Sequence, residues 1–532
     1  MRHVVTEADK ALLLQQEIHY SYRLYVLNSK EGKVLDELNG ISSIGSYQID
    51  ADSTIRRTTS FVLQLHDSYG SSHIEEKIES WIGYDFVLQI GIYSIRDGHY
   101  TWYDCGTYTI TSTNTSYDAV TNTLSTELSD WFSKLDGTRN GQIGGAPTIL
   151  IPNKDENGTP VTIRQAATGI LKDNGIQNYI IQDIGEFYGM DSYHPDYAAY
   201  RASHPAWNHL PYDLKYSAGC TLSDILLQLR DLYPNCEMCY DVYNNFCFHM
   251  IPSCSGEPLY LDNEFLQKIL IADNSESVAY DISSIKNVTE VFGKTYDVDA
   301  YCETCSFSSN VYTLNLDEYG AYERNQILSF KAPASNLASP QLRVNSLAAL
   351  PVYYEGTKNA VAAETMQKDT VYAVKIVSLE TAYAAYFLGS FQPHALCVLT
   401  NNAKDSFYTK DYFKAKFNCE NVAFRTEADN PFAIQRIGIL LDVKSGDSFD
   451  NIISDSVALQ NAVYYNKLSS TTKDTVTITT HMIPWLDVNT KVSYQKQQES
   501  EAHEYMIKSI SHDLSNYSTS ITLHRFYPLQ FE

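Results

Sequence analysis

The sequence has 532 residues, of which 44% are hydrophobic and 19% are charged, and this composition is typical of a folded protein with several hydrophobic cores. Its length predicts about three or four domains, or about two large β domains. The formal net charge of −25 argues against a broad nucleic-acid-binding surface, because such a surface needs clustered lysine and arginine side chains.

Neither a membrane span nor a secretory signal is predicted. No stretch approaches the roughly 18 consecutive apolar residues of a membrane helix. The apolar run Ala11–Leu14 is too short for a signal sequence. We therefore expect no membrane insertion, synthesis in a reducing cytosol and free thiols on the 10 cysteines.

Tyrosine is abundant, with 41 residues against 20 phenylalanines. A tyrosine buries its ring and keeps its hydroxyl hydrated, so the surplus favours half-exposed strands or large interfaces. Proteins rich in β-structure are also rich in tyrosine in general, and this simpler explanation carries equal weight.

The first part of the chain predicts a strand followed by a pair of strands. Ile18–Leu27 is the first strand, and a turn follows it at Ser29–Gly32. Ser46–Ile55 and Thr58–Leu65 form the pair, with the basic residues Arg56 and Arg57 between them.

Three consecutive strands are predicted between residues 81 and 131. In Tyr84–Ile92 the even-numbered residues are all apolar and should face a core, whereas Asp85, Gln89 and Gly91 should lie on the accessible face. The segment carries no residue pattern that performs chemistry, so we interpret it as a shaped sheet.

Residues that favour turns lie between these strands. Asp97-Gly98 supplies the positive φ of a tight hairpin, and the chain returns as Tyr100–Ile110. Gly106 interrupts that return strand and predicts a bulge or a close backbone contact. Leu124–Trp131 is the third strand. The whole sequence shows no evident internal repeat.

A small α+β domain is predicted over Ile163–Asp262, after a break at Leu135–Gly145 that contains four glycines within nine residues. Helices are expected from Ile163 to Asn174 and after Thr221, which starts a capping box. Cys236–Asp241 and Asn245–Ile251 should form a hairpin.

The remaining chain predicts further strands, with one helix and a linker. The linker is Pro333–Pro340 and the helix spans Asp455–Leu468. The expected strands are Tyr179–Ile184, Ile285–Gly293, Val311–Leu316, Gln326–Phe330, Tyr372–Leu379, Leu396–Leu399 and Gln435–Leu441, followed by a C-terminal meander of Thr475–Met482, Lys491–Gln495, Glu504–Ser511 and Ser518–Phe526.

Two CxxC pairs, Cys236/Cys239 and Cys302/Cys305, are candidates for a zinc site, since four thiolates complete a tetrahedron. The spacer between the pairs is far longer than in compact zinc knuckles, and Cys247 and Cys254 make the assignment ambiguous. Ordinary buried thiols are the preferred interpretation, and zinc is the alternative.

Histidines and carboxylates form no recognisable catalytic pattern. The loop Phe187–Pro211 contains His194, His204 and His209 with Asp191, Asp196 and Tyr200, but their spacing matches no ligand motif. His503-Glu504 begins like the zinc-protease motif HExxH, yet Ile507 stands at the fifth position. The sequence has no GxSxG elbow, no phosphate loop and no GxGxxG. We therefore expect no catalytic, cofactor-binding or metal-binding residue, and the sequence does not identify interface residues.

Several stretches mark turns and core positions, and together they span most of the chain. They are Ile49-Asp50 with Ser53–Thr58, Trp102–Ile110, Tyr117–Ala119 with Leu124–Asp130 and Leu135–Gly141, Pro211–Leu214 with Ala218-Gly219 and Leu229–Pro234, and Ile483–Asn489 with Tyr505–Ser511 and Arg525–Pro528. In this order, the stretches resemble the tail or baseplate hub proteins of phages and prophages of Gram-positive bacteria.

The resemblance implies a mainly β fold with an α+β insert and two tube-like β-barrel domains per chain. The barrels would be built from Ile18–Trp131 and from Ile285–Phe330 plus Phe432–Phe526. The implied domains are a first barrel (1–150), an α+β peripheral domain (151–280), return strands of the barrel region (281–340), a variable inserted domain (341–430) and a second barrel with the C-terminal strands (431–532). Asn345–Asn430 departs from the family pattern.

The implied function is a homotrimeric hub at the tip of a phage tail or baseplate. Such a hub joins the sixfold tail tube or distal tail protein to a threefold spike or fibre, and it lines the channel for the tape measure protein and for DNA, which passes without specific binding. Some relatives carry a peptidase or a cell-wall hydrolase beyond the hub, but the chain ends at Glu532, soon after the hub motifs, so we expect no such domain. The alternatives are a tail-associated hydrolase that uses paired carboxylates and a carbohydrate-binding adhesin that uses the loop Phe187–Pro211.

Overall fold

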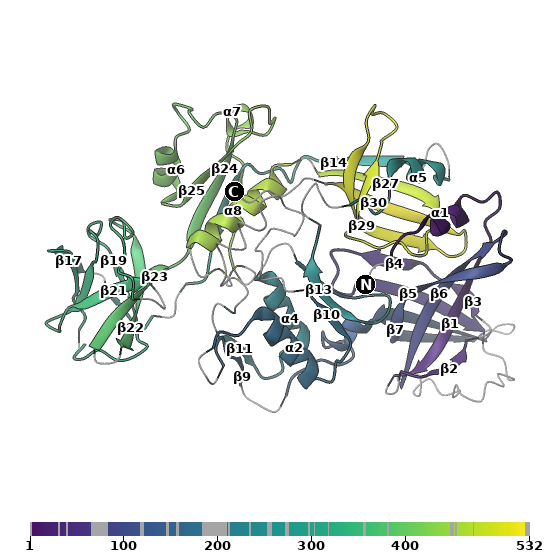
Figure 1. Cartoon of the computed structure of the whole chain (residues 1–532), viewed down its shortest axis with the longest axis horizontal. Helices are drawn as coiled ribbons and strands as arrows, with labels where there is room; N and C mark the ends of the chain where they lie inside the picture. Colours follow the sequence, from purple (N-terminus) through teal and green to yellow (C-terminus); the bar gives the residue numbers. More distant parts are fainter. Residues whose placement is uncertain are drawn as a thin grey trace. The chain divides into compact units, whose positions relative to one another are not determined.

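Strands dominate the computed structural model, which confirms the mainly β fold (Figure 1). The structure describes residues 3–29, 32–38, 41–64, 83–117, 122–144, 148–155, 159–182, 210, 213–232, 236–252, 258–271, 276–295, 298–302, 304–317, 319–354, 358–379, 382–446, 449, 452, 455–471 and 473–526. The chain divides into unit 1, which comprises Met1–Ser283 and Thr472–Gln530, and unit 2, which comprises Ser284–Thr471. No helix in the described part of the chain is long and apolar enough to cross a membrane.

The described helices of unit 1 are α1 (Glu7–Leu13), α2 (Ile163–Asp173), α4 (Leu222–Asp231), α5 (Asn263–Lys268) and the 3-10 helix η2 (Trp131–Lys134). Its strands are β1 (Tyr20–Asn28), β2 (Val34–Glu37), β3 (Ile41–Ile44), β4 (Tyr47–Asp50), β5 (Arg57–Gln64), β6 (Tyr84–Ser94), β7 (His99–Tyr117), β8 (Asn122–Asp130), β9 (Thr148–Ile151), β10 (Tyr179–Ile181), β11 (Leu214–Ser217), β12 (Cys236–Tyr240), β13 (Phe246–Met250), β14 (Glu276–Asp281), β27 (Lys473–His481), β28 (Lys491–Tyr494), β29 (His503–Asp513) and β30 (Ser518–Arg525).

One sheet of 13 strands organises unit 1. Its order is β14-β27-β30-β29-β4-β5-β8-β7-β6-β1-β2, and β28 pairs with β29 while β3 pairs with β5. Early and late parts of the sequence meet where β4 pairs with β29, with Gln48 opposite Ser511. One hydrophobic core takes side chains from both parts, for example Phe86 and Ile510.

The four predicted C-terminal strands are confirmed, but they do not form the expected meander, because β27 pairs with β30 and not with β28. The sequence predicts that Ile285–Phe330 joins these strands in a second barrel, whereas the structure places Ile285–Phe330 in unit 2. The strand that joins the C-terminal strands is β14, which pairs with β27. Alternation of apolar residues marks a strand without naming its neighbour, so the pattern could not decide this pairing.

Unit 1 contains the same four-stranded arrangement twice. Motif A has the order β5-β8-β7-β6 and motif B has the order β27-β30-β29-β28, and all neighbouring strands are antiparallel. In each motif the third strand in sequence has a one-residue bulge against the fourth, at Thr111 in β7 and at Lys508 in β29. Each motif also has a flanking antiparallel strand, β4 on β5 and β14 on β27.

Aligning the two bulges brings buried positions of the two motifs into correspondence. Ile110 then matches Ile507, and the pairs Leu128/Leu523 and Phe61/Ile478 follow from the strand registers, with all six residues buried. The flanking helices correspond as well, because α1 contacts β6 and α5 contacts β28. Corresponding positions share burial more than residue type, which explains why no repeat is evident in the sequence.

The three strands predicted between residues 81 and 131 are confirmed as β6, β7 and β8. Gly106 has a φ of +126° and adjoins the predicted bulge, where Cys105 has no opposite residue on β6. Asp85 differs from the expectation, because it is only 1% exposed. Lys134 Nζ on η2 lies 2.9 Å from both oxygens of this carboxylate, and that partner is 49 residues away in sequence.

The α+β segment of unit 1 follows the prediction. Capping boxes at Thr162 and Thr221 begin α2 and α4, because each threonine hydroxyl accepts from a backbone N–H three residues later. The predicted hairpin is β12 with β13, and β10 adds to it in parallel. Most of the loop 187–211 lies outside the described residues.

The described residues of unit 2 form two sheets. Its elements are β15 (Val288–Phe292), β16 (Ala300–Cys302), β17 (Cys305–Ser308), β18 (Val311–Leu314), β19 (Ile327–Lys331), β20 (Gln341–Val344), β21 (Leu350–Tyr354), β22 (Val371–Leu379), β23 (Ala382–Ser390), β24 (His394–Thr400), α6 (Lys410–Phe417), β25 (Val422–Thr426), α7 (Ile434–Ile437), β26 (Leu441–Lys444) and α8 (Asp455–Ser469). The orders are β25-β24-β15-β26 and β16-β19-β22-β23-β21-β20-β18-β17.

Two expectations for unit 2 are wrong, and the helix α8 is confirmed. The linker Pro333–Pro340 connects β19 and β20, which belong to the same eight-stranded sheet. The strand expected at Gln435–Leu441 is instead the helix α7, which ends at Gly438 with a φ of +75° before β26 begins. Glycine permits that left-handed turn, which a continuous strand would not contain.

We expect the substitution Gly141→Ala to destabilise unit 1 by about 2–3 kcal/mol, because it forces strain on the backbone. Gly141 has a φ of +104°, and an added Cβ would lie 2.3 Å from the carbonyl oxygen of Leu135. Gly144→Ala is the matched control, since an added Cβ there meets no atom within 4 Å. Urea unfolding measures both variants, and equal midpoints would contradict the prediction.

Candidate functional site

A buried ion network joins the 13-stranded sheet to the α+β segment. Arg56 and Arg57 are 4% and 2% exposed. Arg56 Nη1 donates to Glu237 Oε2 on β12 at 2.7 Å, and Arg57 Nη2 donates to Asp487 Oδ1 at 2.8 Å. Arg57 also donates to the carbonyl oxygen of Tyr240. The two arginines therefore hold β12 and the 487 loop against β5.

Glu237 is the centre of this network and is 4% exposed. Besides Arg56, its carboxylate accepts from Asn489 Nδ2 at 2.6 Å and contacts His249 Nε2 at 2.7 Å. Burial by itself would lower the pKa of Arg56, but the charge and the hydrogen bond of Glu237, together with smaller contributions from neighbouring groups, outweigh burial and raise the pKa. Arg56 therefore stays charged, and its ion pair with Glu237 positions the α+β segment.

Asp130, the last residue of β8, also contacts this network. Its carboxylate accepts from the backbone N–H of Arg57 at 2.8 Å and of Phe132 at 3.0 Å, so it caps η2 and fixes β5. Burial raises the pKa of Asp130 to about 6 despite these hydrogen bonds.

A cavity of about 570 Å³ lies beside the network. Cys239 and Cys247 line it, opposite each other on the hairpin of β12 and β13. Burial raises the pKa of both thiols to about 11, so they are protonated at neutral pH and are poor nucleophiles.

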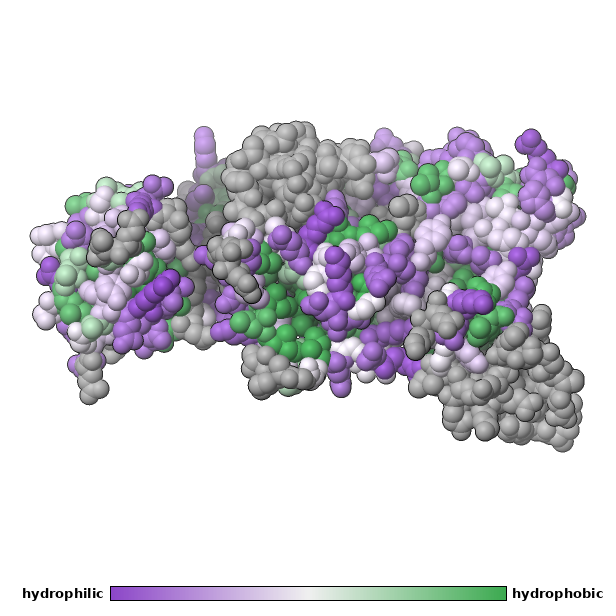
Figure 2. Space-filling model, turned by 60° about the horizontal axis from the view of Figure 1, so that its bottom comes forward, coloured by the Kyte–Doolittle hydropathy of each residue, from purple (hydrophilic) through white to green (hydrophobic). Residues whose placement is uncertain are grey.

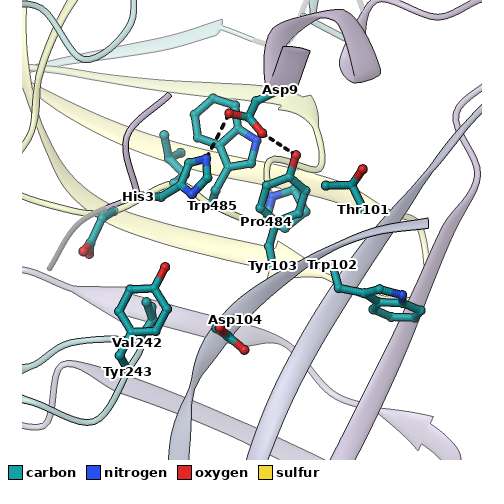
Figure 3. Close-up of a pocket in the computed structure, with 12 residues that line it drawn as sticks. His3, Asp9, Thr101, Trp102, Tyr103, Asp104, Val242, Tyr243, Pro484 and Trp485 are labelled. Atoms are coloured by element: carbon teal, nitrogen blue, oxygen red, sulfur yellow. Dashed lines mark hydrogen bonds and ion pairs between the residues drawn. The ribbon is translucent and has the colours of Figure 1, made fainter. Parts of the chain in front are cut away.

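A smaller pocket of about 220 Å³ lies near the start of the chain (Figure 3). His3 Nε2 lies 3.0 Å from Asp9 Oδ2, and the hydroxyl of Tyr103 donates to Asp9 Oδ1 at 2.7 Å. The ring of Trp485 lies 6.0 Å from the ring of His3. The indole N–H of Trp485 is buried without an acceptor among the described residues.

This pocket contains a carboxylate, a histidine and a tyrosine, as an acid–base site would, but the pKa of the carboxylate is shifted in the wrong direction for a general acid. Burial alone would raise the pKa of Asp9, but hydrogen bonds from His3, Tyr103 and Thr6 outweigh it and lower the pKa. The pKa of Tyr103 is raised by burial and by its bond to Asp9. Asp9 is therefore a fixed acceptor that anchors His3 and helix α1, and a general acid at neutral pH would need the opposite shift.

The residues that the sequence singled out as possible metal ligands lie in different sheets or outside the described residues. Cys236 and Cys239 lie in β12, whereas Cys302 and Cys305 lie in β16 and β17 of another sheet. No three His, Cys, Asp or Glu side chains among the described residues gather where they could hold a metal ion. Cys254 and the loop histidines 194, 204 and 209 lie outside the described residues. The His503-Glu504 pair lies in the strand β29, where the zinc-protease motif would require a helix.

Part of the tyrosine surplus lies on a half-exposed face of β1, β6 and β7. Tyr93 and Tyr100 pack ring to ring with centroids 5.2 Å apart, and Tyr100 and Trp102 follow at 5.4 Å. The Arg23 guanidinium covers the Trp102 ring at 3.8 Å, and Gly91 leaves room for that ring. Figure 2 shows patches of hydrophobic residues between hydrophilic ones on the face it draws.

The comparisons with known proteins concern a C-terminal segment and the whole fold. Residues 429–530 match a family described as "Domain of unknown function (DUF5048)". No curated protein matches the sequence.

Three solved structures similar to this chain are each described as a tail protein. The 43 kDa tail protein of prophage MuSo2 from Shewanella oneidensis is 11% identical with a TM-score of 0.44, over 95% of this chain and 98% of that one. The tail protein from Neisseria meningitidis MC58 is 9% identical with a TM-score of 0.43, over 95% and 97%. The prophage tail protein gp18 from Listeria monocytogenes EGD-e is 10% identical with a TM-score of 0.39, over 94% of each chain. The named sources do not restrict the resemblance to Gram-positive bacteria.

Proposed function

We propose that the chain is a structural hub of a phage or phage-like tail tip, where it assembles as a homotrimer. The observation that carries this proposal is the duplication of motifs A and B within one sheet. Three chains contribute six copies of the arrangement, so a trimer presents a pseudo-sixfold ring. Such a ring matches a sixfold tail tube or distal tail protein on one side and a threefold spike or fibre on the other.

The acidic charge supports a role in lining a channel. With a net charge of −25, the chain repels the phosphates of DNA and does not hold them. DNA and the tape measure protein then pass along the wall without specific binding. The proposed location is the tail tip or baseplate of a particle, after synthesis in the host cytoplasm.

The mass of the full chain in solution tests the proposal. We expect a species with three times the chain mass of 60.1 kDa by analytical ultracentrifugation, and labelled chains at the tail tip by electron microscopy of particles. A strictly monomeric chain that never enters particles would overturn the hub.

The proposed role needs no catalysis. Within the described residues, the buried carboxylates Glu237 and Asp130 serve as structural acceptors for arginine and backbone groups. Zymography on cell walls tests this part, because clear lysis by the purified full chain would favour a tail-associated hydrolase.

A further inference from the structure

Among the described strands of unit 1, two edges lack the partner strand that their counterparts have. In motif B, the second half of β29 pairs with β30 on one side and with β4 on the other. In motif A, the corresponding residues 112–117 of β7 pair with β8, and no described strand occupies their other side. The counterpart of β4 is β14, whose far side is likewise unoccupied by any strand that the structure describes.

We infer that β14 of one copy of the chain pairs with residues 112–117 of β7 in a second copy. The junction repeats between chains the contact that β4 makes with β29 within the chain. It is heterologous, because each copy offers β14 for one contact and β7 for the other, so a closed ring leaves neither of these two edges unpaired. The inference rests on the proposed trimeric hub and names the surfaces that close it.

The register of the junction on the β7 side follows from the bulges. Within the chain, Ser511 lies three positions after the bulge residue Lys508 and opposite Gln48. The residue three positions after the bulge at Thr111 is Asn114. Asn114 is therefore the counterpart of Ser511 and should lie opposite the counterpart of Gln48.

The register on the β14 side follows from the flanking strands. Gln48 lies opposite Thr58 on β5, and Thr58 corresponds to Thr475 on β27. The residue opposite Thr475 is Ala279. The junction therefore places Ala279 of one copy opposite Asn114 of the next.

Side chains of β14 are more exposed than their counterparts on β4, as expected for a strand that lacks a partner strand on one side. Tyr47 and Ile49 of β4, which the β29 pairing helps to cover, are each 1% exposed. Their counterpart positions are Val278, which is half-buried, and Tyr280, which is 56% exposed. Ile282 just beyond β14 is 70% exposed. Pairing with a second copy would remove this apolar surface from water.

A disulfide trap in the full chain tests the junction. In the double variant Asn114→Cys with Ala279→Cys, the paired Cα atoms should be about 4.5–5.5 Å apart, which suits a disulfide. Oxidised glutathione accepts the electrons of the two thiols. We expect bands of two and three linked chains on a non-reducing gel, which a reductant abolishes.

Three controls make the trap specific. Gln48→Cys with Ser511→Cys should link the equivalent junction within one chain and add no mass, which also shows that such variants fold. Asn114→Cys with Ser277→Cys, two positions out of register, should give no link beyond the wild type with its own cysteines. The single variants Asn114→Cys and Ala279→Cys should link only when mixed.

The possible outcomes distinguish an error in the proposed β14–β7 pairing from an error in the proposed trimeric hub. If the intrachain control links but Asn114→Cys with Ala279→Cys gives no interchain band, the junction is wrong, and a trimer measured by ultracentrifugation would still support the hub. If interchain links form but stop at two chains or continue past three, the junction is right and the trimeric hub is overturned.

Discussion

The substitution Glu237→Gln is expected to destabilise unit 1 by about 3–5 kcal/mol, because it leaves a buried arginine without its counter-charge. Arg56 is 4% exposed and has its 2.7 Å ion pair with Glu237. His249 and Asn489 also contact this carboxylate at 2.7 and 2.6 Å. Urea unfolding of the full chain, followed by a signal from unit 1, measures the loss.

The control for Glu237 is an exposed ion pair of similar length. Lys268 Nζ lies 2.6 Å from Glu264 Oε1 on α5, where the two side chains are 53% and 80% exposed. Glu264→Gln should cost about 0.5 kcal/mol or less, since water screens that pair. The double variant Arg56→Met with Glu237→Leu should recover much of the loss, because it removes both buried charges. A Glu237→Gln protein as stable as the Glu264→Gln protein would contradict the prediction.

Lowering the pH from about 7 to about 4 is expected to destabilise unit 1 by about 3 kcal/mol through His512 alone. Burial lowers the pKa of His512 to about 3, from a usual value of 6.5. Its Nδ1 lies 2.7 Å from the hydroxyl of Thr519, while Nε2 is buried without a partner among the described residues. Between pH 6.5 and 3 the unfolded chain therefore binds a proton at His512 that the folded chain does not bind. The stability that this difference contributes is complete above pH 6.5 and is lost as the pH falls toward 3.

The location of His512 makes the pH effect specific to the sheet junction. Its ring stacks on Tyr47 at a centroid distance of 5.0 Å, where β29 pairs with β4. His512→Phe keeps a ring there and removes the titration. The difference in stability between pH 7 and 4 should shrink by about 3 kcal/mol in this variant, because the other titrating groups are common to both proteins. Parallel pH curves for the two proteins would contradict the assignment.

The sequence predicted those elements whose signals lie within a few residues. The alternation in Tyr84–Ile92 and the Asp97-Gly98 turn identify the β6–β7 hairpin, because both signals are local. The capping box at Thr221 located the start of α4 for the same reason.

The candidate site could not be predicted in this way. Arg56 and Arg57 look like a basic turn in the sequence, yet both are buried by acceptors far along the chain, with Glu237 181 residues and Asp487 430 residues away. Asp85 is hidden by Lys134 in the same manner. A charged residue is placed inside or outside by its partner, and no local pattern names that partner.

By itself, the sequence determined that unit 1 is built from antiparallel hairpins with a helical segment between them, because hairpins and caps depend on neighbouring residues. Only the tertiary structure decided that β14, and not Ile285–Phe330, joins the last strands, and that motifs A and B repeat one arrangement. Strand edges pair through backbone groups that every residue carries, so the choice of neighbour is made by the assembled core and leaves little trace in residue type.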